Sequence, residues 1–414
     1  MGKNIIFCAD GTWDGPPDET DRTAIDRSDS EQLSNLDTST NVFKVFQNLA
    51  GDLTQESATL RNEGEKFHTA ANGQTRQIVK YLHGVGDSSN KLNRFLGGAF
   101  GLGVIARVVR GYTFISRYYD PGDAIYVVGF SRGAYTARAL AGMIATVGLL
   151  NRATYDPADK DSAYGLGISA WRAFREKSLR NEGLATKLAN SLVDLVQGIS
   201  AKPLPEGGLT ADVPIKAVAV WDTVGSLGIP VYAGAGRVDV FRFTNSVLSD
   251  KVEYGFHAMA INERREDFPV AKWQERKNVE QVWMMGAHAD VGGGYPVKES
   301  TLSNIGLSWM MSKLAGVGTI FGEELRYSLD PSELAASIQI PFHTPWEQSP
   351  FNAFGKQDRQ PEITDVFHET VLKRLQAGGG YALPGCGALT AAQLAGLRLD
   401  PALYVMASNK EDGA

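Results

Sequence analysis

The chain has few cysteines and no long apolar run, and each shortage excludes a class of protein. Only two cysteines, Cys8 and Cys386, occur among 414 residues, so the chain is not built like a disulfide-rich secreted domain. No stretch approaches the length of a transmembrane helix, and the first apolar run is too short for a signal peptide. We therefore expect synthesis in the cytoplasm, with any export following a route that reads no N-terminal signal.

An excess of positive charge is also absent. The formal net charge is −6 and the isoelectric point is near 5.6, so a nucleic acid is not an expected partner. A local patch could still make transient contact with a membrane surface. Hydrophobic residues at 43% and charged residues at 21% are ordinary for a globular protein.

Short apolar runs alternate with helical patterns along the chain, which is typical of the α/β class. The predicted buried strands cover residues 4–8, 78–83, 124–130, 215–221 and 279–285. We expect an α/β-hydrolase-like fold with a mostly parallel central sheet flanked by helices. Helical or loop insertions would form a cap over it.

The predicted hydrolase domain covers residues 1–330, with polar insertions at about 14–76 and 151–212. Residues 331–414 are weakly patterned and are expected to pack on the same domain, with a helix near 366–376. A further helix is expected after residue 300, with Ser303 as its candidate cap.

The sequence Gly129-Phe130-Ser131-Arg132-Gly133 fits a nucleophile elbow. A serine on a sharp turn between strand and helix projects its hydroxyl above the sheet, and flanking glycines relieve crowding there. The apolar strand before it and the small-residue helix after it favour a nucleophile over an ordinary structural turn.

A nucleophilic serine needs a base, and the base needs a carboxylate that orients it. His288 follows the strand at 279–285 and is the preferred base, while His368 is the runner-up. Asp222 ends the strand at 215–221 and lies between serine and histidine in the usual chain order, so it is the preferred acid. A capping role for Asp222 is the alternative, and Asp290 is a competing acid that more readily braces the His288 loop.

The loop after the first strand commonly supplies an oxyanion-binding N–H. Gly11 or Thr12 could therefore act with the N–H of Arg132, and Asp10 and Trp13 are expected to line the site. No ligand cluster of known spacing surrounds this loop, so we expect neither a metal nor a cofactor.

The charged run at residues 262–267, together with His257, has two interpretations. It is either a solvated face or an internal ion-pair network that supports the His288 loop.

Several motifs occur in the order that one family shows. They are FCADGTWDG, GVGD, PGDAIYVVGFSRGAYTARALAGMI, VWDTVGSLG, HAMAINERREDF, QVWMMGAHADVGGGYP and LSNIGLSWMM. Together they resemble the bacterial and fungal α/β-hydrolase family that includes the first family of type VI secretion phospholipase effectors. The resemblance implies Ser131 as nucleophile, Asp222 as acid and His288 as base, with the loop at residues 10–12 lining the site.

The sequence therefore predicts a serine ester hydrolase that acts on a lipid or small acyl-ester substrate, as a lipase or phospholipase does. The alternatives are an amidase or peptidase with the same triad, and a non-catalytic binding module. An effector of this family would also have a secretion apparatus or an immunity protein as partner.

Overall fold

The computed structural model describes most of the chain. The described ranges are residues 2–11, 37–57, 63–84, 99–178, 201–224, 247–329, 331–349, 351–353, 355–377, 381–386 and 389–400. The candidate site residues Thr12 and Trp13 lie outside these ranges.

A central sheet of ten strands organises the described residues, in the order β12-β11-β10-β9-β8-β5-β1-β4-β3-β2. Its strands are β1 (Asn4–Ala9), β2 (Asp52–Leu53), β3 (Glu63–Thr69), β4 (Thr75–Leu82), β5 (Ala124–Phe130), β8 (Ile215–Trp221), β9 (Val252–Ala260), β10 (Val279–Met284), β11 (Val366–His368) and β12 (Arg398–Asp400). Every pairing is parallel except those of β3 with β2 and β4. The expected mostly parallel sheet is confirmed.

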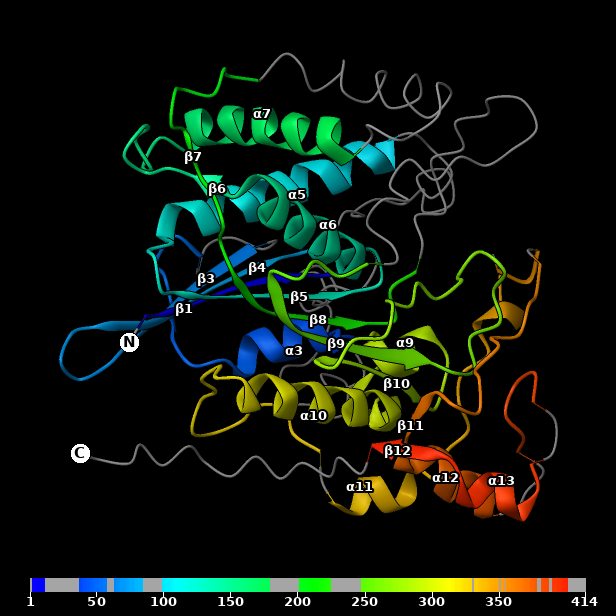
Figure 1. Cartoon of the computed structure of the whole chain (residues 1–414). Coiled ribbons are helices and arrows are strands. Elements are labelled where there is room, and N and C mark those ends of the chain that lie inside the picture. The colour runs from blue at the N-terminus through cyan, green and yellow to red at the C-terminus, as the bar shows by residue number, and fades with distance from the viewer. Residues whose placement is uncertain are drawn as a thin grey trace.

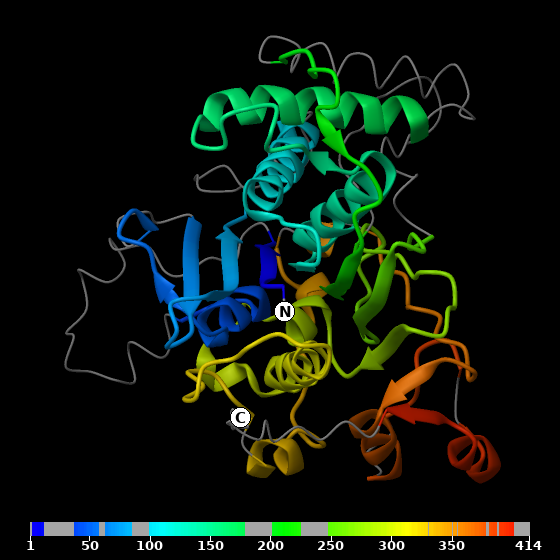
Figure 2. The ribbon, with the colours of Figure 1, turned by 60° about the vertical axis from the view of Figure 1, so that its left-hand side comes forward.

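Helices cover both faces of this sheet (Figures 1 and 2). On one face lie α5 (Ala99–Tyr118), α6 (Arg132–Val147) and α7 (Lys160–Ser178), and on the other lie α3 (Asn41–Asn48) and α10 (Thr301–Gly316). The remaining helices are α9 (His288–Gly292), α11 (Pro331–Ala336), α12 (Glu369–Gln376) and α13 (Ala391–Ala395), with single 3-10 turns at Val297–Glu299, Pro345–Glu347 and Phe351–Ala353. A two-stranded ribbon, β6 (Leu149–Leu150) with β7 (Leu209–Thr210), lies apart from the sheet.

Successive side chains of β1 alternate between two hydrophobic cores, one on each face of the sheet. Ile5 and Phe7 pack into the core shared with α5 and α6, whereas Ile6 and Cys8 pack into the core shared with α3 and α10. All four side chains are fully buried. Since successive residues of a strand point to opposite faces, a continuous apolar run is what a sheet covered on both sides requires.

The sequence patterns predicted five of the ten strands of the sheet, and β9 and β3 are the longest of those that they missed. β9 lies between β8 and β10, but its sequence VEYGFHAMA mixes charged and polar residues with apolar ones. β3 pairs with β4, so part of the region 14–76 belongs to the sheet and is not an excursion from it. Helix α3 in that region also contributes buried side chains to the core, among them Val42 and Phe46.

Two helix ends differ from expectation. Helix α10 begins at Thr301 with Ser300 in the capping position, so Ser303 lies inside the first turn and caps nothing. The helix expected near 366–376 begins only at Glu369, because residues 366–368 form β11. Among the described residues, no helix is long and apolar enough to cross a membrane.

Candidate active site

Ser131 occupies a sharp, strained turn between β5 and α6. Its backbone has φ 55° and ψ −122°, a conformation that non-glycine residues rarely adopt. The residue is only 8% exposed. Strain of this kind costs roughly 1–3 kcal/mol and persists only where the surrounding structure holds it. The turn therefore has the geometry that the elbow motif predicts.

Glycines on either side of Ser131 are required by close backbone contacts. A Cβ on Gly129 would lie 2.4 Å from the carbonyl oxygen of Gly133, and a Cβ on Gly133 would lie 2.1 Å from that of Ala9. A Cβ on Gly11 would lie 3.4 Å from the Cβ of Ser131. The loop that follows β1 therefore lies directly beside the serine.

Asp222 and His288 form a buried hydrogen-bonded pair. The Nδ1 atom of His288 lies 2.6 Å from Oδ2 of Asp222, and the two side chains are 8% and 0% exposed. Asp222 follows β8 with φ 32°, and its Oδ1 accepts a hydrogen bond from the N–H of Ala260 at 2.9 Å. An imidazole held in this way keeps Nε2 available as a proton acceptor.

The His288 ring packs against the residue that precedes the serine. Its centroid lies 4.6 Å from that of Phe130 and 5.1 Å from that of Phe268. A Cβ on Gly292, at the end of the same short helix α9, would collide with the Phe130 ring at 2.0 Å. The His288 loop and the β5–α6 turn are therefore in direct contact at the carboxyl edge of the sheet.

The charge states of the pair suit base catalysis. Burial lowers the pKa of His288, and this outweighs the hydrogen bond that the ring donates to Asp222, which raises the pKa. Burial alone would raise the pKa of Asp222, but the Arg359 cation and the His288 hydrogen bond hold it well below its usual range. The arrangement thus combines a neutral imidazole with an ionised carboxylate.

The charged run at 262–267 contains an internal network rather than only a solvated face. Glu263 is fully buried and forms an ion pair with Arg265 at 2.8 Å. Its Oε2 also accepts a hydrogen bond from the N–H of His288 at 3.1 Å. The side chain of Asn262 accepts from the N–H of Gly286 at 2.9 Å. These contacts fix the backbone on which His288 stands.

Asp290 braces the same loop from the other side. Its carboxylate accepts hydrogen bonds from the N–H of Ala287 and from the N–H and Nδ1 of His343. The Nε2 atom of His343 lies 3.2 Å from Glu299, and its ring stacks on Tyr295 at 3.6 Å. The contacts assign Asp290 to support of the loop, and Asp222 is the carboxylate that touches His288.

Asp10 is a buried carboxyl at the end of β1. It accepts hydrogen bonds from the hydroxyls of Tyr81 and Thr40 and from the N–H of Gly11. Burial raises the pKa of Asp10 to about 6. Because the Gly11 N–H donates to Asp10, an oxyanion could use it only after that bond breaks, and its oxyanion role stays a prediction.

No metal-binding cluster of three or more His, Cys, Asp or Glu residues occurs in the part of the chain that the structure describes. The runner-up base, His368, is buried at the start of α12, where Nδ1 contacts the hydroxyl of Thr370 at 2.9 Å. His257 is also buried, with Nε2 accepting from the N–H of Thr223, next to Asp222. Burial lowers its pKa to about 3, so this ring is neutral and structural.

Sequence patterns gave no sign of Arg359. It lies in the weakly patterned C-terminal region, yet its guanidinium contacts both carboxylate oxygens of Asp222, at 2.9 and 3.1 Å. A single arginine in an irregular segment carries no periodicity or spacing that could have marked it.

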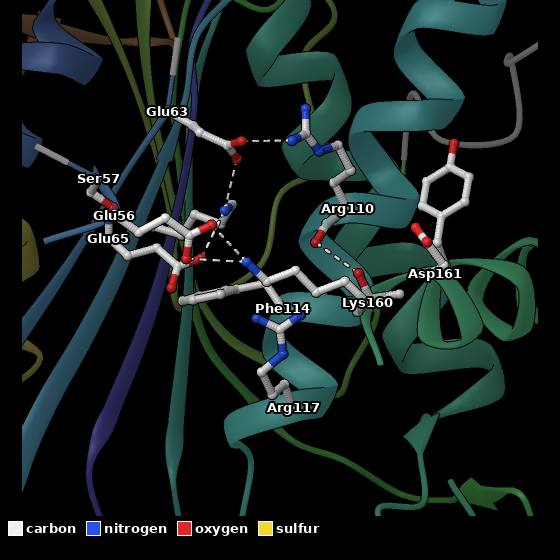
Figure 3. A pocket seen from close by; sticks show the side chains of 12 residues that line it. Glu56, Ser57, Glu63, Glu65, Arg110, Phe114, Arg117, Lys160 and Asp161 are labelled. Carbon is white, nitrogen blue, oxygen red and sulfur yellow. Dashed lines mark hydrogen bonds and ion pairs between the residues drawn. The ribbon is translucent and has the colours of Figure 1, made fainter. Parts of the chain in front are cut away.

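Among the cavities of the described residues, two of those that Ser131, Asp222 and His288 do not line have strongly charged walls. One of about 230 Å³ lies between strands β3 and β4 and helices α5 and α7 (Figure 3). Its charged walls are paired with each other: Lys80 bonds Glu63 and Glu65, and Arg110 bonds Glu63. A second, of about 680 Å³, is lined by the first residues of β10 and by β11 and β12. Charged side chains line both cavities, among them Arg117 in the first and Lys272 in the second.

Comparisons with known proteins find several that are similar to this chain. An uncharacterized protein of Saccharomyces cerevisiae, YEL023C, is 25% identical over 272 residues, which cover 64% of this chain and 32% of that protein. An uncharacterized protein from Pseudomonas aeruginosa shares 16% identity with a TM-score of 0.42, covering 81% of this chain and 48% of the other. The Tle1 effector, solved bound to the VgrG spike of the type VI secretion system, shares 16% identity with a TM-score of 0.34. The match covers 71% of this chain and 51% of the effector chain.

The chain thus spans about a third of the yeast relative and about half of each solved chain. A family model for the catalytic domain of Tle1-like phospholipase effectors of the type VI secretion system matches residues 3–313. This match supports a hydrolase activity of the lipase or phospholipase type. By this match over most of its length, the chain belongs to the Tle1-like phospholipase effector family of the type VI secretion system.

Proposed function

We propose that the protein is a serine ester hydrolase with Ser131, Asp222 and His288 as its triad. The observation that carries the proposal is the 2.6 Å contact between His288 Nδ1 and Asp222 Oδ2, beside a serine on a strained elbow. These groups follow three parallel strands, β5, β8 and β10, at the carboxyl edge of the mostly parallel sheet, where open α/β sheets place their active sites.

In the proposed reaction the Ser131 hydroxyl attacks the ester carbonyl carbon and transfers its proton to Nε2 of His288. Asp222 accepts the Nδ1–H and stabilises the imidazolium that forms. The tetrahedral intermediate then collapses, the ester C–O bond breaks, and the leaving alkoxide takes the proton from His288. A water molecule, deprotonated by His288, attacks the acyl-enzyme, releases the carboxylic acid and restores the serine.

The developing oxyanion would lie at the amino end of α6. The N–H of Arg132 at the start of this helix is the first donor, and the positive end of the helix adds a favourable field. The loop at residues 10–12 is the source of a second donor, supported by the short distance between Gly11 and Ser131.

We propose an acyl ester of a lipid or phospholipid as the substrate, because the family model describes phospholipase effectors. The solved relative bound to a VgrG spike supports delivery by a type VI secretion system, with a spike protein as partner. Neither substrate nor partner requires a cofactor for the chemistry described.

The test offers purified protein a series of p-nitrophenyl esters of increasing acyl length, and then vesicles of phosphatidylethanolamine and phosphatidylglycerol. We expect hydrolysis by the native protein and none by Ser131→Ala. Full activity of Ser131→Ala would overturn the mechanism. Turnover of amide but not ester substrates would instead establish an amidase or peptidase, and no turnover of any substrate would favour a binding module.

A further inference from the structure

Arg359 makes an unusually complete contact with the carboxylate of Asp222. One guanidinium nitrogen donates to Oδ1 at 2.9 Å and the other to Oδ2 at 3.1 Å. The same two nitrogens also donate to the carbonyl oxygens of Ala260 and Phe268, at 3.3 and 2.7 Å. The Arg359 side chain is 5% exposed, so the cation has little contact with water.

Arg359 and His288 both contact the same oxygen of Asp222, Oδ2. Oδ2 of Asp222 receives both the imidazole Nδ1 and Arg359, while Oδ1 receives Arg359 and the N–H of Ala260. A planar guanidinium fork matches a planar carboxylate and fixes its orientation. The direction in which Asp222 presents Oδ2 to His288 is therefore set in part by Arg359.

The backbone around Arg359 is attached to the network that supports His288. The N–H of Gln357 donates to the carbonyl of Arg264 at 2.7 Å, and the N–H of Glu266 donates to the carbonyl of Gly355 at 3.0 Å. Nearby, the Arg265 guanidinium lies 4.6 Å from the Phe351 ring centroid. In each of these contacts one partner lies between residues 351 and 359, which is beyond residues 3–313 that the family model matches.

We propose that Arg359 is a positioning residue for the hydrolysis, which orients Asp222 toward His288 and disfavours proton uptake by that pair. The segment beyond the family-matched residues thereby completes the catalytic site. This proposal rests on the proposed function, in which Asp222 and His288 act on Ser131.

The charges around His288 explain the expected pH effect. Its neighbours are two anions, Asp222 and Glu263, and two cations, Arg265 and Arg359. Removing the Arg359 charge would leave two anions against one cation. The Asp222–His288 pair would then take up its proton at a higher pH, and the base would be lost at a higher pH than in the native protein.

The experiment compares two variants, Arg359→Lys, which keeps the positive charge, and Arg359→Met, which removes it. Both variants lose the two-pronged guanidinium contact with Asp222. The matched control is Arg398→Ala, which removes a more distant arginine bonded to the carbonyl of Thr364. The readouts are the rate constant for inactivation by a fluorophosphonate from pH 5 to 9, and the melting temperature of each variant.

We expect both substitutions to slow inactivation roughly tenfold to a hundredfold at high pH, since small misplacements of catalytic groups have effects of this size. The acid limb of the profile should move to higher pH in Arg359→Met and stay in place in Arg359→Lys and Arg398→Ala. Folded variants with the native rate and profile would overturn the proposal. If Arg359→Met does not fold, a native rate for Arg359→Lys overturns it alone.

A second readout separates this proposal from the proposed function. Histidines labelled with ¹³C at Cε1 are titrated by NMR, and the His288 signal is assigned with His288→Gln. A higher midpoint in Arg359→Met than in the native protein supports the proposal even if no ester or probe reacts. Equal midpoints in native, Lys and Met proteins overturn it, whatever the activity.

Discussion

His288 and Asp222 are separated by 66 positions in the chain, yet Nδ1 of one lies 2.6 Å from Oδ2 of the other. The two residues follow β10 and β8, with only β9 between those strands in the sheet. Parallel pairing on both sides of β9 brings their carboxyl ends to one edge, where Ser131 also stands after β5. Each prediction below follows from this arrangement or from the contacts that hold it.

Asp222→Asn should keep the hydrogen-bonding shape but present the wrong partner to Nδ1. The imidazole would then favour the tautomer that cannot accept the serine proton at Nε2, so kcat should fall roughly 1,000- to 10,000-fold. Asp212→Asn is the matched control, because Asp212 also has a positive φ of 55° but is exposed and pairs with Lys251 at the surface. The measurement is the rate of ester hydrolysis by the two variants. Equal losses of activity would contradict the role of Asp222 as the acid of the triad.

Gly133→Ala should destabilise the fold through a backbone collision. A Cβ there would lie 2.1 Å from the carbonyl oxygen of Ala9, and overpacking of this severity costs about 3 kcal/mol or more. Gly142→Ala in the same helix meets only the Phe174 ring at 3.5 Å, and should gain about 0.5–1 kcal/mol from helix propensity. Urea unfolding measures both changes. A neutral Gly133→Ala would show that the turn has more room than its contacts indicate.

Glu263→Gln should leave Arg265 as a buried, uncompensated cation and weaken the support of His288. Breaking such a pair typically costs about 3–5 kcal/mol. The control is Asp358→Asn, which removes the partner of Arg264 in an exposed ion pair. A loss of unfolding free energy below about 1 kcal/mol is expected there. Chemical denaturation of both proteins is the measurement, and similar stabilities would argue against a structural role for the Glu263 network.

His343 should make stability depend on pH. Its hydrogen bond to Asp290 raises its pKa in the folded protein, and the contact with Glu299 adds to this. The protonated ring then contributes stability that is fully present below the unfolded pKa of about 6.5 and is lost as the pH rises through the folded value. The difference in unfolding free energy between native protein and His343→Gln should therefore be largest at acidic pH. His68→Gln, on strand β3 next to the edge strand β2, is the control substitution.

The sequence was sufficient where chemistry follows a regular element. Ser131, Asp222 and His288 each stand at the end of an apolar run, so their meeting at one sheet edge could be predicted. β9 could not, because Glu253 and His257 interrupt its apolar residues, so its sequence does not form a continuous apolar run. The role of Arg359 could not be predicted either. It is an isolated arginine that lies 137 positions from Asp222 in the sequence, and only folding brings the two side chains together.

Competing interpretations of the charged run also needed the fold. Glu263 and Arg265 read equally well as surface residues, and only their burial beside His288 identifies the ion pair as internal. The same applies to Asp290, which lies two residues from His288 but turns its carboxylate toward Ala287 and His343.

In the proposed mechanism Ser131 is the activated nucleophile. The most direct measurement is mass spectrometry of the protein after reaction with a fluorophosphonate probe, followed by peptide mapping of the adduct. We expect a single adduct on Ser131, absent from Ser131→Ala and formed far more slowly in His288→Gln. An adduct on a different residue, or labelling that persists unchanged in Ser131→Ala, would contradict it.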